Sequence, residues 1–211
     1  LESISTIRLI IEKQNEYKRG LLCTKADVYK AFDTVEHNTI VNALTHYEID
    51  PNTIRAFLRE IRECGMKFRL PDGSLSKAIK QFRGVKQGGC ASPWLFVLVL
   101  NFVLRGLIAS WGEREMGIKL KNGLVVSILL FADDIMLLCT CFDHANTMLN
   151  ELQARLREHG LCVTVVKCMT MENSWVAERG VVKLGDDCVP IAAGSRGFKF
   201  LGTMLTMDAS S

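Results

Sequence analysis

Two adjacent acids interrupt the most apolar stretch of this chain. The run from Leu124 to Cys141 is almost entirely apolar, and Asp133 and Asp134 stand in its middle. Burying two neighbouring carboxylates in an apolar strand is opposed by their desolvation and by their mutual repulsion. The pattern therefore predicts two strands, 124–131 and 135–141, with the acids in a turn between them that reaches solvent or a cation.

Capping and turn residues divide the rest of the chain into short helices and strands. The expected helices are 4–20, 40–47, 51–61, 94–111 and 143–160, and the further strands are 21–29, 66–70, 75–82, 117–121, 161–166, 181–184 and 198–206. Asn122-Gly123 predicts a type I′ turn. The order of elements in the middle of the chain predicts an α+β fold, with a ferredoxin-like split β-α-β sheet and helices on one face.

The composition is that of a globular protein in a reducing environment. Of the 211 residues, 48% are apolar and 23% are charged, and the formal net charge is +3. The eight cysteines include no C-x-x-C pair, which is typical of reduced thiols and predicts an intracellular location, in the cytoplasm or the nucleus. Polar or charged residues interrupt the apolar runs 94–109 and 124–141, so we expect no membrane span.

A third carboxylate, Asp27, is expected close to the end of strand 21–29. Clustered carboxylate oxygens suit Mg²⁺, and two such ions at one cluster are a common device for in-line displacement at phosphorus. One interpretation is therefore a metal site formed by Asp27, Asp133 and Asp134. The other is structural, because Asp favours solvated turns through local hydrogen bonds.

A glycine-rich loop from Gly84 to Pro93 leads into the helix 94–111. Its three glycines (84, 88 and 89) expose backbone N–H groups beside a helix start, where a phosphate or a nucleotide can bind. The P-loop pattern is absent. A plain connector between a strand and a helix explains the glycines as well.

Positive charge is concentrated between Arg55 and Lys86. This segment holds nine Lys and Arg residues against three acids, a local charge of +6, so the remainder is net negative by three. A basic face beside an acidic cluster suits a polymer of phosphates handled by metal ions. A solvated helix face accounts for Arg55, Arg59 and Arg62 almost as well.

Five strings, in this order, resemble the motifs of reverse transcriptases, specifically those of non-LTR retrotransposons. They are Asp27-Val-Tyr-Lys-Ala-Phe-Asp33, Gly84-Val-Lys-Gln-Gly88 with Ser92-Pro93, Phe131-Ala-Asp-Asp134, Gly160-Leu-Cys-Val-Thr-Val-Val-Lys167 and Phe198-Lys-Phe-Leu-Gly202. The resemblance extends from about Ser3 to Thr206. It implies a polymerase palm and RNA-directed DNA polymerisation, with an RNA template, a DNA primer and deoxynucleotide triphosphates as partners and no membrane.

The resemblance also implies roles for single residues. Asp27, Asp133 and Asp134 would hold two Mg²⁺ ions, and Lys167 would protonate the leaving pyrophosphate. The remaining roles are sugar packing by Phe32, nucleotide contact by Gln87 and Gly88, and the primer grip by Phe200, Leu201 and Gly202.

Two departures from the family pattern concern the loop and the lysine. Gln87-Gly-Gly-Cys-Ala-Ser-Pro93 differs in its middle three residues from the usual Gln-Gly-Cys-Pro-Leu-Ser-Pro, and Thr164 and Cys168 replace the Asn and Thr that often flank the lysine. We expect a single domain fragment over 1–211, with fingers at about 51–86, palm at about 21–50 and 87–172, and a primer-grip region at about 173–206. It would lack the first finger strands and the thumb. The alternative function is an inactive module that only binds nucleic acid.

Overall fold

A computed structural model of the chain describes residues 2–62, 65–80, 82–86, 88–192 and 196–207. The chain divides into two compact units. The first unit comprises residues 1–29, 104–158 and 162–211, and the second comprises 30–103 and 159–161. The expected fingers fall within the second unit, whereas the expected palm is shared between both.

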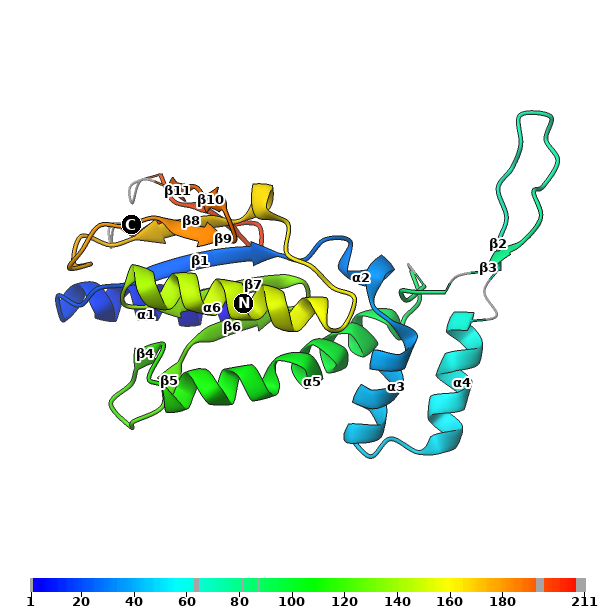
Figure 1. The fold of residues 1–211 in the computed structure, drawn as a ribbon, viewed down its shortest axis with the longest axis horizontal. Coiled ribbons are helices and arrows are strands. Elements are labelled where there is room, and N and C mark those ends of the chain that lie inside the picture. The colour runs from blue at the N-terminus through cyan, green and yellow to red at the C-terminus, as the bar shows by residue number, and fades with distance from the viewer. Residues whose placement is uncertain (1, 63–64, 81, 87, 193–195, 208–211) are drawn as a thin grey trace. The chain divides into compact units, whose positions relative to one another are not determined.

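A five-stranded sheet forms the centre of the first unit (Figure 1). In spatial order its strands are β11 (Ile191–Ala192), β8 (Met169–Glu172), β1 (Leu22–Asp27), β7 (Asp134–Cys139) and β6 (Ile128–Phe131). Neighbouring strands from β8 to β6 are antiparallel, and β11 is parallel to β8. Most residues of the central strands β1 and β7 are buried, as the apolar sequence of β7 predicts, although β1 includes Thr24, Lys25 and Asp27.

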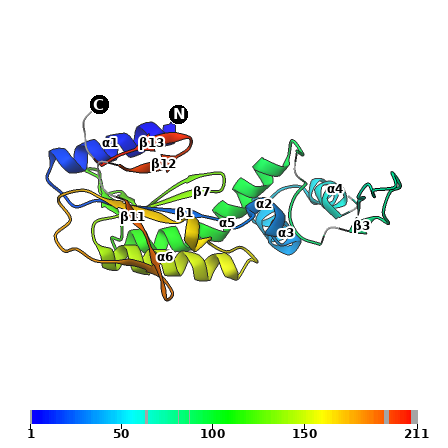
Figure 2. The same cartoon turned by 90° about the horizontal axis from the view of Figure 1, so that it is seen from above.

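Helices cover both faces of this sheet (Figure 2). On one face, α1 (Glu2–Glu16) places Ile7 and Ile11 in a core cluster with residues of β1 and β7. On the other face, α6 (Phe142–Arg157) packs against the same two strands. The expectation of helices on one face is therefore wrong. Successive side chains of a strand point to opposite faces, so an apolar strand needs a cover on both.

Two-stranded antiparallel ribbons complete the first unit. They pair β4 (Ile118–Lys119) with β5 (Val125–Val126), β9 (Val182–Leu184) with β10 (Asp187–Val189), and β12 (Phe198–Phe200) with β13 (Thr203–Leu205). The predicted type I′ turn between β4 and β5 is wrong. A type I′ turn needs positive φ at both central residues, whereas of Asn122 and Gly123 only Gly123 has a positive φ, of 84°.

Helices dominate the second unit. Its elements are α2 (Ala31–Thr34), α3 (His37–His46), α4 (Pro51–Arg62), β2 (Gly65–Met66), β3 (Ile79–Lys80) and the first half of α5 (Ser92–Glu113), which continues into the first unit. Asp50 caps α4 as predicted, because its Oδ2 accepts hydrogen bonds from the N–H groups of Asn52 (2.9 Å) and Thr53 (3.0 Å). The predicted hairpin is also present, since β2 pairs with β3.

Helix α5 is the one helix of the described residues that is long and apolar enough to cross a membrane by length and composition alone. The helix predicted over 94–111 is therefore confirmed, and it includes Asn101 and Arg105, the polar and charged residues that interrupt its apolar run. The core helix of a soluble protein has the same composition, and Leu100 and Leu104 are buried here. The apolar character of α5 is therefore weak evidence for a membrane span.

The local pattern predicts the chain less well after Gly160. Residues 161–166, expected as a strand, instead lead into a 3₁₀ turn, η1 (Val165–Lys167). Strand β8 was not expected, because its sequence is partly polar. It is accommodated in the core because the hydroxyl of Thr170 pairs with that of Thr24 in β1, at 3.0 Å.

Candidate active site

The acid pair lies at the two-residue turn between β6 and β7. Phe131 at the end of β6 pairs with Asp134 at the start of β7, so Ala132 and Asp133 form the turn. Ala132 has a left-handed φ of 52°. Such a conformation costs a residue other than glycine about 1–3 kcal/mol and is enriched at functional sites. Asp133 thus lies in a turn between two apolar strands, as the sequence predicts, whereas Asp134 is the first residue of the second strand.

Asp27 lies beside this turn. It is the last residue of β1, and the antiparallel register of β1 and β7 pairs it with Asp134. Directly paired residues of antiparallel strands have Cβ atoms about 4.5–5.5 Å apart and point to the same face. Two carboxylates that are distant in the sequence are therefore neighbours at one end of the sheet.

Two lysines form ion pairs with these carboxylates. Lys25 Nζ lies 3.1 Å from Asp134 Oδ1, and Lys167 Nζ lies 3.1 Å from Asp27 Oδ2. The side chains of Lys25 and Asp134 are only 21% and 27% exposed, so their ion pair is partly shielded from solvent. Lys25 was not among the expected site residues. Its place two residues before Asp27, on the same face of β1, is the signal that could have identified it.

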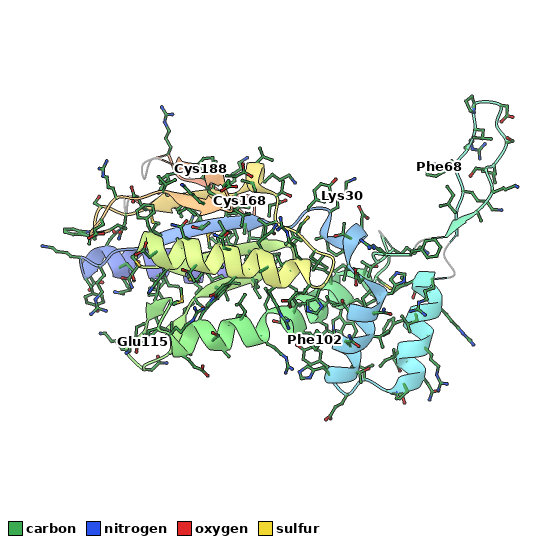
Figure 3. All side chains as sticks on the ribbon, viewed as in Figure 1. Lys30, Phe68, Phe102, Glu115, Cys168 and Cys188 are labelled. Carbon is green, nitrogen blue, oxygen red and sulfur yellow. The ribbon has the colours of Figure 1, made fainter. Side chains whose placement is uncertain are left out.

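The turn η1 holds Lys167 against Asp27. The N–H of Thr164 donates to the carbonyl oxygen of Asp27 (2.8 Å), and the N–H of Lys167 donates to that of Thr164 (3.0 Å). Cys168, labelled in Figure 3, follows the lysine and is buried. Burial raises the pKa of its thiol, which is therefore protonated at neutral pH. Thr164 and Cys168, which depart from the motif pattern, thus lie close to Lys167. The carbonyl oxygen of Thr164 accepts the hydrogen bond that holds the Lys167 backbone in place.

The donor chemistry at this end of the sheet fits a divalent cation. The carboxylates of Asp27 and Asp134 already face positive groups, the two ammonium ions, and Asp133 is exposed on the turn. No group of three or more acidic, His or Cys side chains that could hold a metal ion is found among the described residues. Mg²⁺ does not require one, because it commonly binds one or two carboxylates and takes its other ligands from water and substrate phosphates.

The hairpin β12–β13 adjoins the carboxylate end of the sheet. Lys25 Nζ donates to the carbonyl oxygen of Lys199 in β12, at 3.4 Å. Leu201 and Gly202 form the tight turn of the hairpin, with φ values of 50° and 76°. Phe200 is fully buried in the core cluster with α1, so its side chain is not available to a primer. Of the expected grip residues, Leu201 is half-buried and Gly202 is exposed.

Phe32 and the glycine-rich loop share a pocket within the second unit. This pocket has a volume of about 260 Å³ and is lined by Phe32, Lys86, Gly88, Gly89, Ser92 and Pro93. The ring of Phe32 also packs on Phe96, with the ring centroids 4.9 Å apart. Phe32 therefore combines contact with a core aromatic and access to a pocket. Gln87 lies outside the described residues.

Three arginines share one face of α4. Arg55, Arg59 and Arg62 are exposed and line a shallow pocket of about 300 Å³. Their spacing of three and four residues places them side by side along the helix. Arg55 also donates a hydrogen bond to Asn52 Oδ1, at 2.6 Å. Three neighbouring guanidinium groups are well suited to bind phosphates.

Comparison with known proteins gives matches over nearly the whole chain. Residues 1–205 match the family model described as reverse transcriptase (RNA-dependent DNA polymerase). The chain is 32% identical over 171 residues to the Retrovirus-related Pol polyprotein from type-1 retrotransposable element R2 of Nasonia vitripennis. It is 27% identical over 212 residues to that from type-2 retrotransposable element R2DM of Drosophila melanogaster. These matches cover 81% and 97% of this chain, but only 16% and 19% of the relatives.

Solved structures of telomerase share the fold. Telomerase from Candida tropicalis in complex with a TWJ fragment of telomeric RNA matches 98% of this chain and 31% of its own, with a TM-score of 0.65 and 14% identity. Telomerase from Candida albicans, also in complex with a TWJ fragment, matches 87% of this chain and 32% of its own, with a TM-score of 0.63 and 14% identity. At these identities the likeness shows a common fold alone.

Proposed function

This chain belongs to the reverse transcriptase family, as a domain of the non-LTR retrotransposon type, and we propose that it contains the nucleotidyl-transfer site of an RNA-directed DNA polymerase. The observation that carries the proposal is the register that pairs Asp27 with Asp134 beside the turn at Asp133. The chain spans only 16% and 19% of the two retrotransposon relatives. The RNA template, the DNA primer and the activity of the whole protein are therefore part of the proposal.

We also propose that the sheet is a polymerase palm of the ferredoxin-like kind. The antiparallel order β8-β1-β7-β6 supports this assignment. In such a palm the ends of β1 and β7 would present the carboxylates to a primer terminus.

In the proposed reaction the 3′-hydroxyl oxygen of the primer attacks the α-phosphorus of a deoxynucleotide triphosphate. The bond from that phosphorus to the pyrophosphate oxygen breaks. Asp27, Asp133 and Asp134 would hold two Mg²⁺ ions, which when bound would neutralise the triphosphate and favour transfer of the hydroxyl proton to solvent water. Lys167, whose side chain is 65% exposed beside Asp27, would give a proton to the leaving pyrophosphate.

Substrate selection would depend on the second unit and on the hairpin. Phe32 would pack under the sugar, where a bulky ring clashes with a 2′-hydroxyl and so favours deoxynucleotides. Gln87 and Gly88 would contact the nucleotide, and the turn at Leu201 and Gly202 would contact the primer. The pocket shared by Phe32 and Gly88 supports the first two roles.

Primer extension on a homopolymer RNA template, with the longer protein that carries this domain, tests the proposal. Asp133→Asn should reduce extension by about 100-fold or more, because it removes a charge that acts at the reacting phosphate. Asp186→Asn is the matched control, since Asp186 is exposed at the second position of the two-residue turn between β9 and β10. It should leave extension unchanged.

Two results would contradict the proposal. Extension by the Asp133→Asn protein at the native rate would remove the acid pair from the chemistry. A native protein that binds an RNA–DNA duplex but extends no primer would instead support the inactive binding module. The ion pairs of Lys25 and Lys167 are compatible with that alternative, because they neutralise both carboxylates without a metal.

A further inference from the structure

A basic pocket lies at the opposite end of β1 from the carboxylates. It has a volume of about 660 Å³, and its polar and aromatic lining residues are Lys13, Gln14, Tyr17, Arg19, Lys119 and Lys121. They come from the end of α1, the loop that leads into β1 and the β4–β5 hairpin, all within the first unit (Figure 1). Because β1 has six residues, about 20 Å separate this pocket from Asp27.

Two of the four cations in this pocket have acidic partners. Lys13 pairs with Glu16, at 2.6 Å, and Lys119 pairs with Glu115, which is labelled in Figure 3. Both pairs are exposed, and their members are three and four residues apart in the sequence. They are explained as ordinary surface ion pairs.

The other two cations, Arg19 and Lys121, form no ion pair within the described part of the chain. Each lies over the ring of Tyr17, with the charged group 5.7 Å and 5.5 Å from the ring centroid. A phosphate is a stronger partner for either cation than an aromatic face. Moving them onto a phosphate would uncover the ring of Tyr17, which is 44% exposed, for stacking against a base.

Gln14 supplies a polar group at the wall of the pocket. It continues the buried stripe of Ile7, Ile10 and Ile11 along α1, and its side chain is only 7% exposed. Its Oε1 is buried and has no hydrogen-bond partner among the described residues. A buried acceptor without a donor destabilises the fold, and an apolar side chain would serve packing better. Because Gln14 lines the pocket, a turn of its side chain would bring Oε1 to a hydrogen-bond donor on a ligand.

We propose that this pocket binds a nucleotide of single-stranded nucleic acid. The phosphate would bind Arg19 and Lys121, the base would stack on Tyr17, and an N–H group of the base would donate to Gln14. An acidic protein segment would satisfy the cations but would leave the ring and the carboxamide without matched partners. Because the pocket is remote from Asp27, the inference does not depend on nucleotidyl transfer.

Direct binding and cross-linking test this site without metal ions. In the first experiment, the 211-residue chain is titrated into fluorescein-labelled rU12 or dT12 in EDTA to measure binding. In the second, RNA that contains 4-thiouridine is cross-linked to the chain by ultraviolet light, and the cross-linked peptides are identified by mass spectrometry. We expect a cross-link within the peptide that contains Tyr17. Tighter binding of either oligonucleotide supports the site and shows whether the site prefers RNA or DNA.

Variants separate the site from the fold. Tyr17→Leu should weaken binding about five- to tenfold. Replacing Arg19 and Lys121 together by Gln should reduce the salt slope by about 0.7, because the one phosphate that they bind loses its contacts. Gln14→Leu should weaken binding while leaving the thermal unfolding temperature equal or higher. The control is Lys183→Gln, which removes one exposed charge from β9. It should leave both the affinity for the oligonucleotide and the thermal unfolding temperature unchanged.

The proposal is overturned if cross-links map only elsewhere and the Tyr17 and Gln14 variants bind as the native chain does. It is also overturned if a peptide of twelve glutamates binds this pocket, with the same dependence on Arg19 and Lys121, and no oligonucleotide cross-link appears there. Neither result bears on primer extension at the carboxylates.

Discussion

At the scale of single residues, the two lysines beside the carboxylates determine what the acid pair can bind. Lys25 and Lys167 each place an ammonium group on a carboxylate oxygen that a metal ion would also need. The better shielded pair is that of Lys25 with Asp134, because both side chains are mostly buried. A divalent cation at Asp134 must therefore compete with Lys25.

Replacing Lys25 should strengthen metal binding. Lys25→Met keeps most of the side-chain length and removes the competing charge, so we expect the affinity for Mn²⁺ to rise about two- to fivefold, as for a modest ion pair. Electron paramagnetic resonance of free Mn²⁺ measures this affinity in the 211-residue chain. Lys199→Met, on the exposed side of β12, is the control and should have no effect. Unchanged affinity in Lys25→Met would show that the ammonium and the metal do not share Asp134.

At the scale of elements, Gly84 joins the glycine-rich loop to α2. Its N–H donates to the carbonyl oxygen of Val35, and the N–H of Val85 donates to that of Phe32, both at 2.7 Å. Gly84 has a φ of 82°, and a Cβ atom there would lie 2.6 Å from the carbonyl oxygen of Asp33. Only glycine permits this approach. The loop is therefore anchored beside Phe32.

Gly84→Ala should lower the free energy of unfolding by about 1–3 kcal/mol, through positive φ and backbone contact. Gly88→Ala is the matched control, because Gly88 has a similar φ of 79° but open space around an added Cβ. Gly88→Ala should lower the free energy of unfolding by less than Gly84→Ala does. Urea denaturation measures both variants, and equal losses would show that the backbone around Gly84 relaxes freely.

A second link between elements joins α5 to α6 in the first unit. Trp111 Nε1 donates to Glu151 Oε2 at 2.7 Å, and Arg114 binds the same carboxylate. Trp111 is fully buried. The hydrogen bond from Arg114 holds the pKa of Glu151 below its ordinary value of 4.5.

Glu151→Ala should lower the free energy of unfolding by about 1–3 kcal/mol at neutral pH, because it leaves the buried indole N–H without its acceptor. Because the folded-state pKa of Glu151 is lowered, the charge-dependent part of this difference should persist above about pH 4.5 and shrink as the pH falls below it. Urea denaturation at neutral and acidic pH measures the difference.

The control for this prediction is Glu158→Ala. It removes only an exposed pair with Arg155, so its cost should stay below about 0.5 kcal/mol. A loss in Glu151→Ala that does not change with pH would assign the effect to packing and to the hydrogen bond of Trp111, and none of it to the charge of Glu151.

At the scale of the whole molecule, positive charge is concentrated in one segment of the chain. The chain also covers only a small share of the length of its relatives. Residues 55–86 carry a net charge of +6 in a chain whose total is +3. The match covers 16% of one retrotransposon relative and 19% of another. Phosphate contacts supply much of the affinity of such proteins for nucleic acid. The number of phosphate contacts that this chain can make should therefore limit its affinity for a duplex.

The 211-residue chain should bind an RNA–DNA duplex weakly and extend a primer poorly. Binding should fall steeply with added salt, and replacing Arg55, Arg59 and Arg62 by Gln should reduce the salt slope by about 2–3. Fluorescence anisotropy over a range of salt concentrations measures this slope. Efficient extension by the chain alone, or a salt slope that the three substitutions leave unchanged, would contradict the prediction.

The sequence by itself determined the features that depend on neighbouring residues. The family prediction is confirmed, and the acid turn, the Asp50 cap and the hairpin of β2 and β3 follow their local patterns. Periodicity and turn chemistry act over a few residues, so a single sequence records them directly. The convergence of Asp27 on the acid pair was one of two interpretations of the carboxylates and was also implied by the motif resemblance, but the strand register that pairs Asp27 with Asp134 was not predicted.

Only the tertiary structure decided the features that depend on distant contacts. The second helical layer on the sheet, the burial of Phe200 and the ion pair of Lys25 with Asp134 all require the register of strands far apart in the sequence. A shift of one residue in that register would move every side chain to the other face. That choice is made by the packing of the whole core, which no local pattern contains.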